Sequence, residues 1–260
     1  MRMCSCRGPH AGFVHIRCLV KNAEERGEYD DAEFVKALNM CSQCRQQFHG
    51  PVNVALKRAA WLHFAGRGET DRARQLAICN LGAALFNMDR LDDALVVFKK
   101  IFATRRRLYG PDDFRTIDVE ESLAETLCKI GGEENLRRGL ETLTRTYEWK
   151  CQRYGRDHKL TLASAIHLAS IQRDLGMLTG SIAFMRRLLP VFRRVHGEQH
   201  AATFEAQGIL ADLLVQNNEV DEARDILLVL LPVVRRVLGP HHAYTRRLEN
   251  PHFFDPSRFR

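Results

Sequence analysis

Hydrophobic and small residues recur along the chain with a period of about 42 residues. Near the middle of each period a Leu is followed by a small residue, and these pairs are Leu81-Gly82, Leu123-Ala124, Leu168-Ala169 and Leu210-Ala211. Thirteen residues after the Leu, three of the periods have a second small residue: Ala94, Ser181 and Ala223. In the second period the matching Gly139 is displaced by three places, next to the segment "GGEEN". Two antiparallel helices cross closely where one of them lacks a large side chain, so each period predicts a pair of packed helices.

The boundaries between periods have a pattern of their own, Gly-x-x-His-x-x-Thr. It occurs three times, as Gly155/His158/Thr161, Gly197/His200/Thr203 and Gly239/His242/Thr245. After Gly110 the place of His is taken by Asp113, and 42 residues before Gly110 stands Gly68. One His or Asp per boundary fits a hydrogen-bonding role at a helix start rather than a metal or catalytic site. Four units and the start of a fifth therefore follow residue 68.

The period and its small residues resemble the tetratricopeptide repeat, and the boundary resembles its kinesin-light-chain variety, over about residues 68–248. The resemblance implies a mainly α fold, a right-handed α-solenoid of about four 42-residue helix-turn-helix units. We expect four segments: a small zinc-stabilised finger over 1–50, a connecting or capping helix over 51–67, the solenoid over 68–248, and a disordered tail over 249–260.

Cysteines are concentrated at the start of the chain, with five of the eight among the first 44 residues. Together with one His they read Cys4-x-Cys6, His15-x-x-Cys18 and Cys41-x-x-Cys44. Clustered Cys and His without a secretory leader predict metal binding rather than disulfides. Their order, and the flanks "CSCRG", "FVHIRCL" and "CSQCRQQFHG", resemble the last six ligands of a RING-CH zinc finger.

By that resemblance Cys4, Cys6, Cys41 and Cys44 complete one structural Zn²⁺ site with four thiolate ligands. His15 and Cys18 form half of a second site, whose first Cys pair is missing, so the finger is incomplete. His10 or His49 could serve as the missing ligands of this half-site. The alternative to a zinc finger is that the cysteines are unrelated reduced thiols. In a module with so few large apolar residues, zinc binding would supply about 10–16 kcal/mol of folding free energy.

The charge pattern, the apolar segments and the motifs of the sequence exclude several classes of function. Most of the net charge of +7 comes from Arg pairs that recur with the repeat, which indicates solvated helix surface rather than a nucleic-acid-binding face. No apolar window has the length of a membrane span, and the start has no secretory leader, so we expect an intracellular protein of the cytoplasm or nucleus. Neither a nucleophile motif nor a phosphate loop is present, which argues against a hydrolytic enzyme.

Two functions agree with these features. The first is a zinc-binding scaffold or adaptor that holds a protein or peptide in the solenoid groove lined by the first helix of each unit. The groove candidates are Asn80, Ala83, Glu121, Glu125, Ser170, Arg173, Asp212 and Val215. Kinesin light chains carry paired Asn just before the Leu; only Asn80 matches, so cargo-peptide recognition is not carried over.

The alternative is a component of a RING-type ubiquitin ligase, with a ubiquitin-conjugating enzyme as partner and the substrate recruited by the solenoid. The missing Cys pair is the place beside which such fingers carry the hydrophobic residue that contacts the conjugating enzyme. Its absence favours the scaffold.

Overall fold

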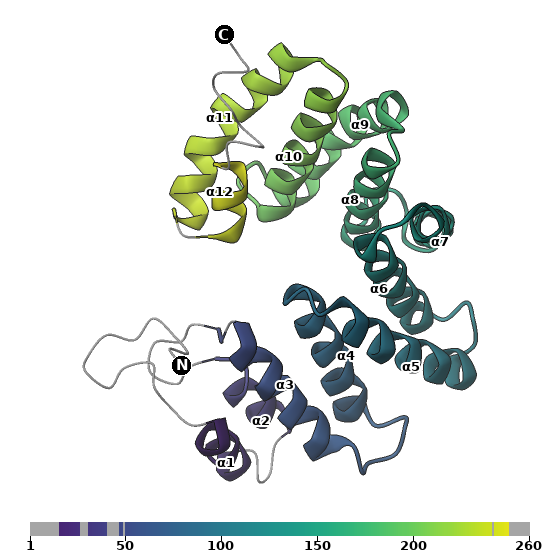
Figure 1. Ribbon diagram of the computed structural model, residues 1–260, viewed down its shortest axis with the longest axis vertical. Helices are drawn as coiled ribbons and strands as arrows, with labels where there is room; N and C mark the ends of the chain where they lie inside the picture. The colour runs from purple at the N-terminus through teal and green to yellow at the C-terminus, as the bar shows by residue number, and fades with distance from the viewer. Residues whose placement is uncertain (1–15, 27–30, 41–46, 49, 241, 250–260) are drawn as a thin grey trace. The chain divides into compact units, whose positions relative to one another are not determined.

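The computed structural model describes residues 16–26, 31–40, 47–48, 50–240 and 242–249, and these ranges are mainly helical (Figure 1). Within them no β-strand is formed, although one isolated bridge pairs Met40 with Gln47. The chain divides into two compact units, residues 1–130 and 131–260. The expectation of a mainly α fold built of helix pairs is confirmed.

The described part of the first unit forms six helices, coloured purple to teal in Figure 1. They are α1 (Ile16–Arg26), α2 (Asp31–Ala37), α3 (Gly50–Phe64), α4 (Arg72–Asn87), α5 (Leu91–Tyr109) and α6 (Phe114–Ile130). From α3 onward each helix packs against the next, and α1 packs against both α2 and α3. The helix expected after residue 50 is therefore present as α3.

The N-terminal helices share their core with α3. Phe34 of α2, Leu38 just after it and the nearby Phe48 are each at most 4% exposed, and they cluster with Leu56 and Phe64 of α3. The segment before residue 50 has too few large apolar residues for a core of its own. Phe34, Leu38 and Phe48 are buried against α3 instead, and such burial is the main stabilising term for short helices.

The first helix pair, α4 and α5, crosses where the small residues predict. A Cβ at Gly82 would lie 2.7 Å from Cε1 of the buried Phe98 on α5, closer than carbon atoms pack. Ala94, the second small residue of this pair, is fully buried in the same cluster. The absence of a side chain at Gly82 thus lets Phe98 fill the space between the two helices.

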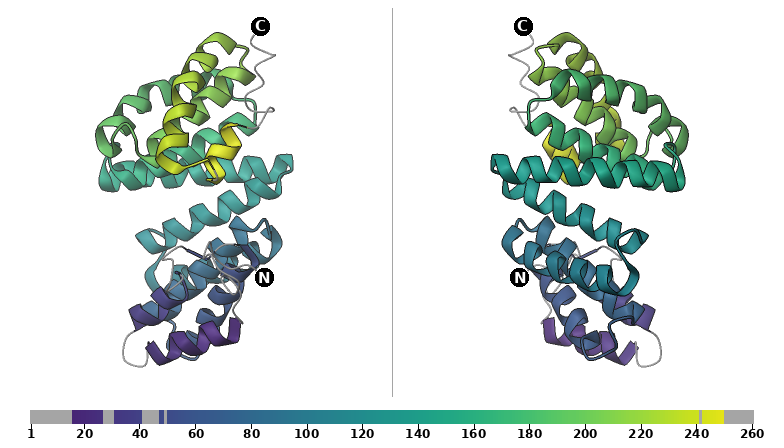
Figure 2. Two further views of the ribbon diagram at one scale, coloured as in Figure 1. Left: turned by 90° about the vertical axis from the view of Figure 1, so that its left-hand side faces the viewer. Right: turned by 90° about the vertical axis from the view of Figure 1, so that its right-hand side faces the viewer.

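Between residues 131 and 249, leaving residue 241 aside, the second unit also forms six helices, which pack side by side in succession (Figure 2, teal to yellow). They are α7 (Glu133–Tyr154), α8 (Lys159–Asp174), α9 (Leu178–His196), α10 (Ala201–Gln216), α11 (Val220–Leu238) and α12 (Ala243–Leu248). Its main core gathers Leu162, Met185 and Phe192, each fully buried, with residues of α10. The small residue Ser181 of α9 is buried and donates a hydrogen bond to the Ala169 carbonyl of α8, at 3.4 Å.

Each boundary between successive repeats is a hydrogen-bonded turn. Gly197 ends α9 with a φ of 100°, a conformation that favours glycine. Nδ1 of His200 accepts a hydrogen bond from the Ala202 N–H at 3.1 Å, and Oγ1 of Thr203 donates to the Gly197 carbonyl at 2.7 Å. The same capping bond recurs at His158, His242 and Asp113, at 3.2, 3.2 and 2.9 Å. The predicted helix-start role of these residues is confirmed.

Candidate partner-binding surface

In the second half of the chain, α8, α10 and α12 are the first helices of successive repeats. Two groove candidates on α8 (Ser170 and Arg173) and two on α10 (Asp212 and Val215) are half-buried. The structure joins two of them, because Nη1 of Arg173 lies 2.9 Å from Oδ2 of Asp212. Since α10 also contacts α8 directly, this ion pair connects the same face of two neighbouring first helices.

A third residue joins this pair from α12. Nη2 of Arg247 lies 3.3 Å from the same Oδ2 of Asp212. The side chains of Arg173 and Asp212 are 17% and 19% exposed, so the pair is shielded from water and its electrostatic attraction is stronger than at an open surface. Burial raises the pKa of the Asp212 carboxyl, while the two guanidinium groups act in the opposite direction. We call Arg173, Asp212 and Arg247 the arginine–aspartate cluster.

The candidates in the first unit differ in exposure. On α4, Asn80 is half-buried and Ala83 is exposed, whereas on α6 Glu125 is half-buried and Glu121 is only 6% exposed. Glu121 stands at the position in its repeat that the buried Ile166 occupies in the next repeat. This position faces the packing between helices, so Glu121 does not present its side chain on an open groove surface.

The arginine of α12 is the member of the cluster that the sequence does not single out. Arg246-Arg247 reads as one of the Arg pairs on solvated surface, and Arg246 is indeed exposed. A signal was present in the boundary pattern, because Gly239/His242/Thr245 predicts the start of another first helix just before Arg247. Only the packing of α12 beside α10 shows that Arg247 reaches Asp212.

The predicted zinc ligands lie almost entirely outside the described residues. This holds for Cys4, Cys6, His15, Cys41 and Cys44. Among the residues that the structure describes, no group of three His, Cys, Asp or Glu side chains is arranged to hold a metal ion. The finger and its Zn²⁺ therefore stay predictions.

The remaining member of the predicted ligand set, Cys18, lies on α1 as an exposed free thiol. The alternative ligands His10 and His49 also lie outside the described residues.

Comparison with known proteins bears directly on the helix pairs. A sequence profile of the tetratricopeptide repeat matches residues 75–115 and 204–244. These two stretches are tetratricopeptide repeats. No curated protein matches it.

Solved structures with the same fold include kinesin-light-chain-like proteins. One holds the nearly identical TPR-like repeats of a Podosopora anserina protein assigned to the kinesin light chains, with 14% identity, a TM-score of 0.54, and coverage of 85% of this chain and 95% of that one. Another is BtubC (BKLC) from P. vanneervenii, with 11% identity, a TM-score of 0.61, and coverage of 87% and 91%. At such identities the likeness is one of fold.

The repeat assignment gives the helices of the second unit distinct positions. Counted from the boundary turns, α8, α10 and α12 are the first helices of successive repeats. The arginine–aspartate cluster belongs to first helices only. Within the described ranges, moreover, no helix combines the length and the apolar character needed to cross a bilayer.

Proposed function

We propose that this protein is an interaction scaffold, in which the first helices of the tetratricopeptide repeats hold a segment of a protein partner. The observation that carries the proposal is the arginine–aspartate cluster on α8, α10 and α12, where Arg173 and Arg247 both contact one Asp212 oxygen, at 2.9 and 3.3 Å. The cluster fixes three successive first helices in register at one face. A surface held in place before binding loses little conformational entropy when a partner is bound.

Photo-crosslinking tests where the partner binds. A photoreactive amino acid such as benzoylphenylalanine is placed at Ala83 on α4 or Ser170 on α8, and for comparison at Val96 on α5 or Val229 on α11. The two controls are 68% and 70% exposed on second helices, so they are at least as accessible to any protein in the cell extract.

We expect a discrete crosslinked product from the first-helix positions that is absent from the second-helix positions. A matching product from Val96 or Val229, or no product from the first helices under conditions in which the full-length chain is folded, would contradict the proposal.

We further propose that the segment before residue 50 binds one structural Zn²⁺ through Cys4, Cys6, Cys41 and Cys44. This part is supported by the order and spacing of the ligands in the sequence. Four thiolates leave no open coordination position, so the ion would stabilise the segment and would not act on a substrate. Two Zn²⁺ ions per chain would favour the alternative of a ligase component, since a RING-CH finger holds two.

A further inference from the structure

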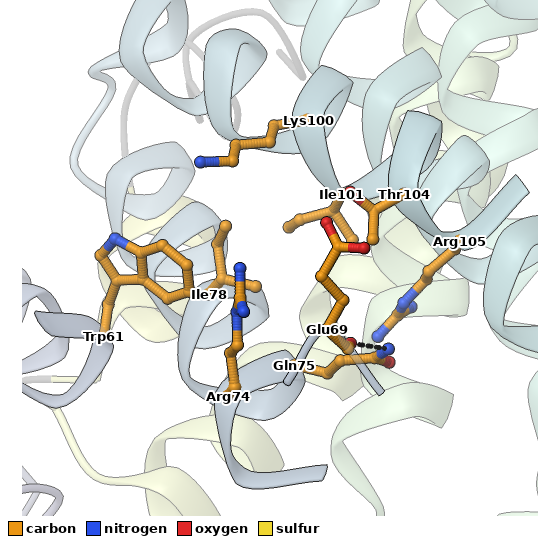
Figure 3. A pocket seen from close by; sticks show the side chains of 9 residues that line it. All are labelled: Trp61, Glu69, Arg74, Gln75, Ile78, Lys100, Ile101, Thr104 and Arg105. Atoms are coloured by element: carbon orange, nitrogen blue, oxygen red, sulfur yellow. Dashed lines mark hydrogen bonds between the residues drawn. The ribbon is translucent and has the colours of Figure 1, made fainter. Parts of the chain in front are cut away.

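A small cavity lies in the first unit where α3, α4 and α5 meet (Figure 3). Its volume is about 40 Å³. Trp61 of α3 lines one side, and the cations Arg74 of α4 and Lys100 of α5 lie close to it, 5.8 and 5.5 Å from the indole centroid. Arg105 of α5 lines the other side.

Arg105 is a buried cation whose partners are neutral. It is 9% exposed, and its two Nη atoms donate to the Arg115 carbonyl at 2.8 Å and to Sγ of Cys79 at 3.0 Å. Nε of the same guanidinium is buried without a hydrogen-bond partner, and no carboxylate of the described residues forms an ion pair with it. Buried charges in proteins are normally paired, whereas Arg105 acts on the Asp113 carboxyl only at a distance, lowering its pKa without an ion pair.

The repeat pattern shows that one of these cations is particular to the first repeat. Arg74 stands six residues after Gly68, at the position of the boundary Thr, which is a fully buried residue in later repeats, as at Thr161 and Thr203. The position of Arg105, five residues before the boundary Gly, is held by another buried cation, Lys150, in the second repeat and by the fully buried Phe192 in the third. Arg74 is thus the departure from the repeat, and it adds a positive charge to the cavity wall that Arg105 also lines.

The one carboxylate in the cavity wall does not neutralise it. Glu69 is ion-paired with Arg107, and this hydrogen bond is the main reason that the pKa of the Glu69 carboxyl is lowered. Lys100 and Arg74 both add to that lowering through their positive potential. The cavity is thus bordered by three cations that Glu69 does not bind, next to one aromatic wall.

We propose that this cavity binds a single carboxylate group carried next to an apolar group, with the carboxylate inside the cavity between Arg74, Lys100 and Arg105 and the apolar part outside it, against the half-buried Trp61. One water needs about 10–15 Å³ of such space, so 40 Å³ holds about three non-hydrogen atoms. A carboxylate has three, whereas phosphate and sulfate have five. The carboxylate comes either from a chain terminus or small acid, or from an acidic side chain, and the site is independent of the first-helix face.

Tryptophan fluorescence tests the proposal on the full chain. The sequence has two Trp, so the variant Trp149→Phe leaves Trp61 as the reporter. The probes are N-acetyl-leucine, with a terminal carboxylate, and N-acetyl-glutamate amide, with a side-chain carboxylate, each compared with phosphate at constant ionic strength. We expect saturable binding with a Kd on the order of 1 mM, stronger for a carboxylate than for phosphate. The tighter of the two acids identifies the source, and tighter phosphate binding overturns the proposal.

Matched variants distinguish a loss of binding at this site from a general effect of charge and from a loss of the folded structure. Lys100→Gln should weaken binding about tenfold, while Lys99→Gln, the same change at an exposed neighbour, should not. Arg105→Met and Arg74→Thr place an apolar or repeat-typical residue in the cavity wall, so both should abolish binding while the thermal midpoint stays the same or rises. Equal effects of Lys99→Gln and Lys100→Gln, or full binding by a folded Arg105→Met chain, would overturn the proposal.

Discussion

Replacing Gly208 by Ala tests how α12 is held on the repeat array. A Cβ at this position of α10 would fall within van der Waals distance of Oη of Tyr244 on α12. That hydroxyl donates to the Phe204 carbonyl at 2.6 Å, and Leu248 of α12 is 1% exposed in the core beside it. The methyl group would therefore displace Tyr244, break its hydrogen bond and loosen α12.

The size of the effect follows from three terms. Overpacking costs about 1–3 kcal/mol, and the lost hydrogen bond costs about 1 kcal/mol. The better helix propensity of Ala returns about 1 kcal/mol. We expect Gly208→Ala to lower the free energy of unfolding by about 1–3 kcal/mol. In a Tyr244→Phe chain the nearest ring atom, Cζ, would be 3.3 Å from the new Cβ, so the same change should there be close to neutral.

Urea unfolding followed by circular dichroism measures all four corners of this double-mutant cycle. Gly180→Ala is the matched control, since Gly180 lies in the same unit on α9 and a Cβ there meets no atom within 4 Å. It should be neutral or stabilising by up to about 1 kcal/mol. Additive effects of Gly208→Ala and Tyr244→Phe, or a Gly208→Ala chain as stable as Gly180→Ala, would refute the reasoning.

Three further outcomes are expected. Thr203→Val should cost about 1 kcal/mol in urea unfolding, because the hydroxyl donates at the boundary, while Thr116→Val should cost nothing, since Thr116 Oγ1 has no partner. Burial lowers the pKa of His196 below its ordinary value of 6.5, so the unfolded chain takes up the proton first as the pH falls. The free energy of unfolding should therefore decrease as the pH drops below about 6.5. A His196→Phe chain with an equally steep decrease would contradict this. Elemental analysis should find one Zn²⁺ per chain, lost in Cys41→Ser and retained in Cys151→Ser.

The repeat could be predicted from sequence because its determinants are local and periodic. A boundary such as Gly197/His200/Thr203 closes within seven residues, and the small residue at Gly82 has its partner Phe98 on the very next helix. Neighbours this close in sequence leave a pattern that one chain reveals by matching itself. The histidine caps and the close crossing of α4 and α5 followed directly from that pattern.

The contacts that distinguish this protein from other repeats are not periodic. Arg173 and Asp212 are both candidates by position, yet their ion pair depends on which sides of α8 and α10 meet. Glu121 is a candidate by the same rule and is buried. The cation Arg74 could have been noticed, because it replaces the boundary Thr, but its convergence with Arg105 requires the packing of α3, α4 and α5.

The hydrogen bonds at the boundaries also bear on how such an array changes in length. Thr203 bonds to Gly197 and Thr245 to Gly239, so at these two boundaries the turn closes within seven residues, whereas Thr161 donates to the Lys150 carbonyl of the preceding helix. An in-frame duplication of a 42-residue stretch that includes either of the two boundaries carries the complete turn with it. Recombination between similar stretches of the gene can therefore lengthen the array at these boundaries while the hydroxyl of the boundary Thr keeps its acceptor.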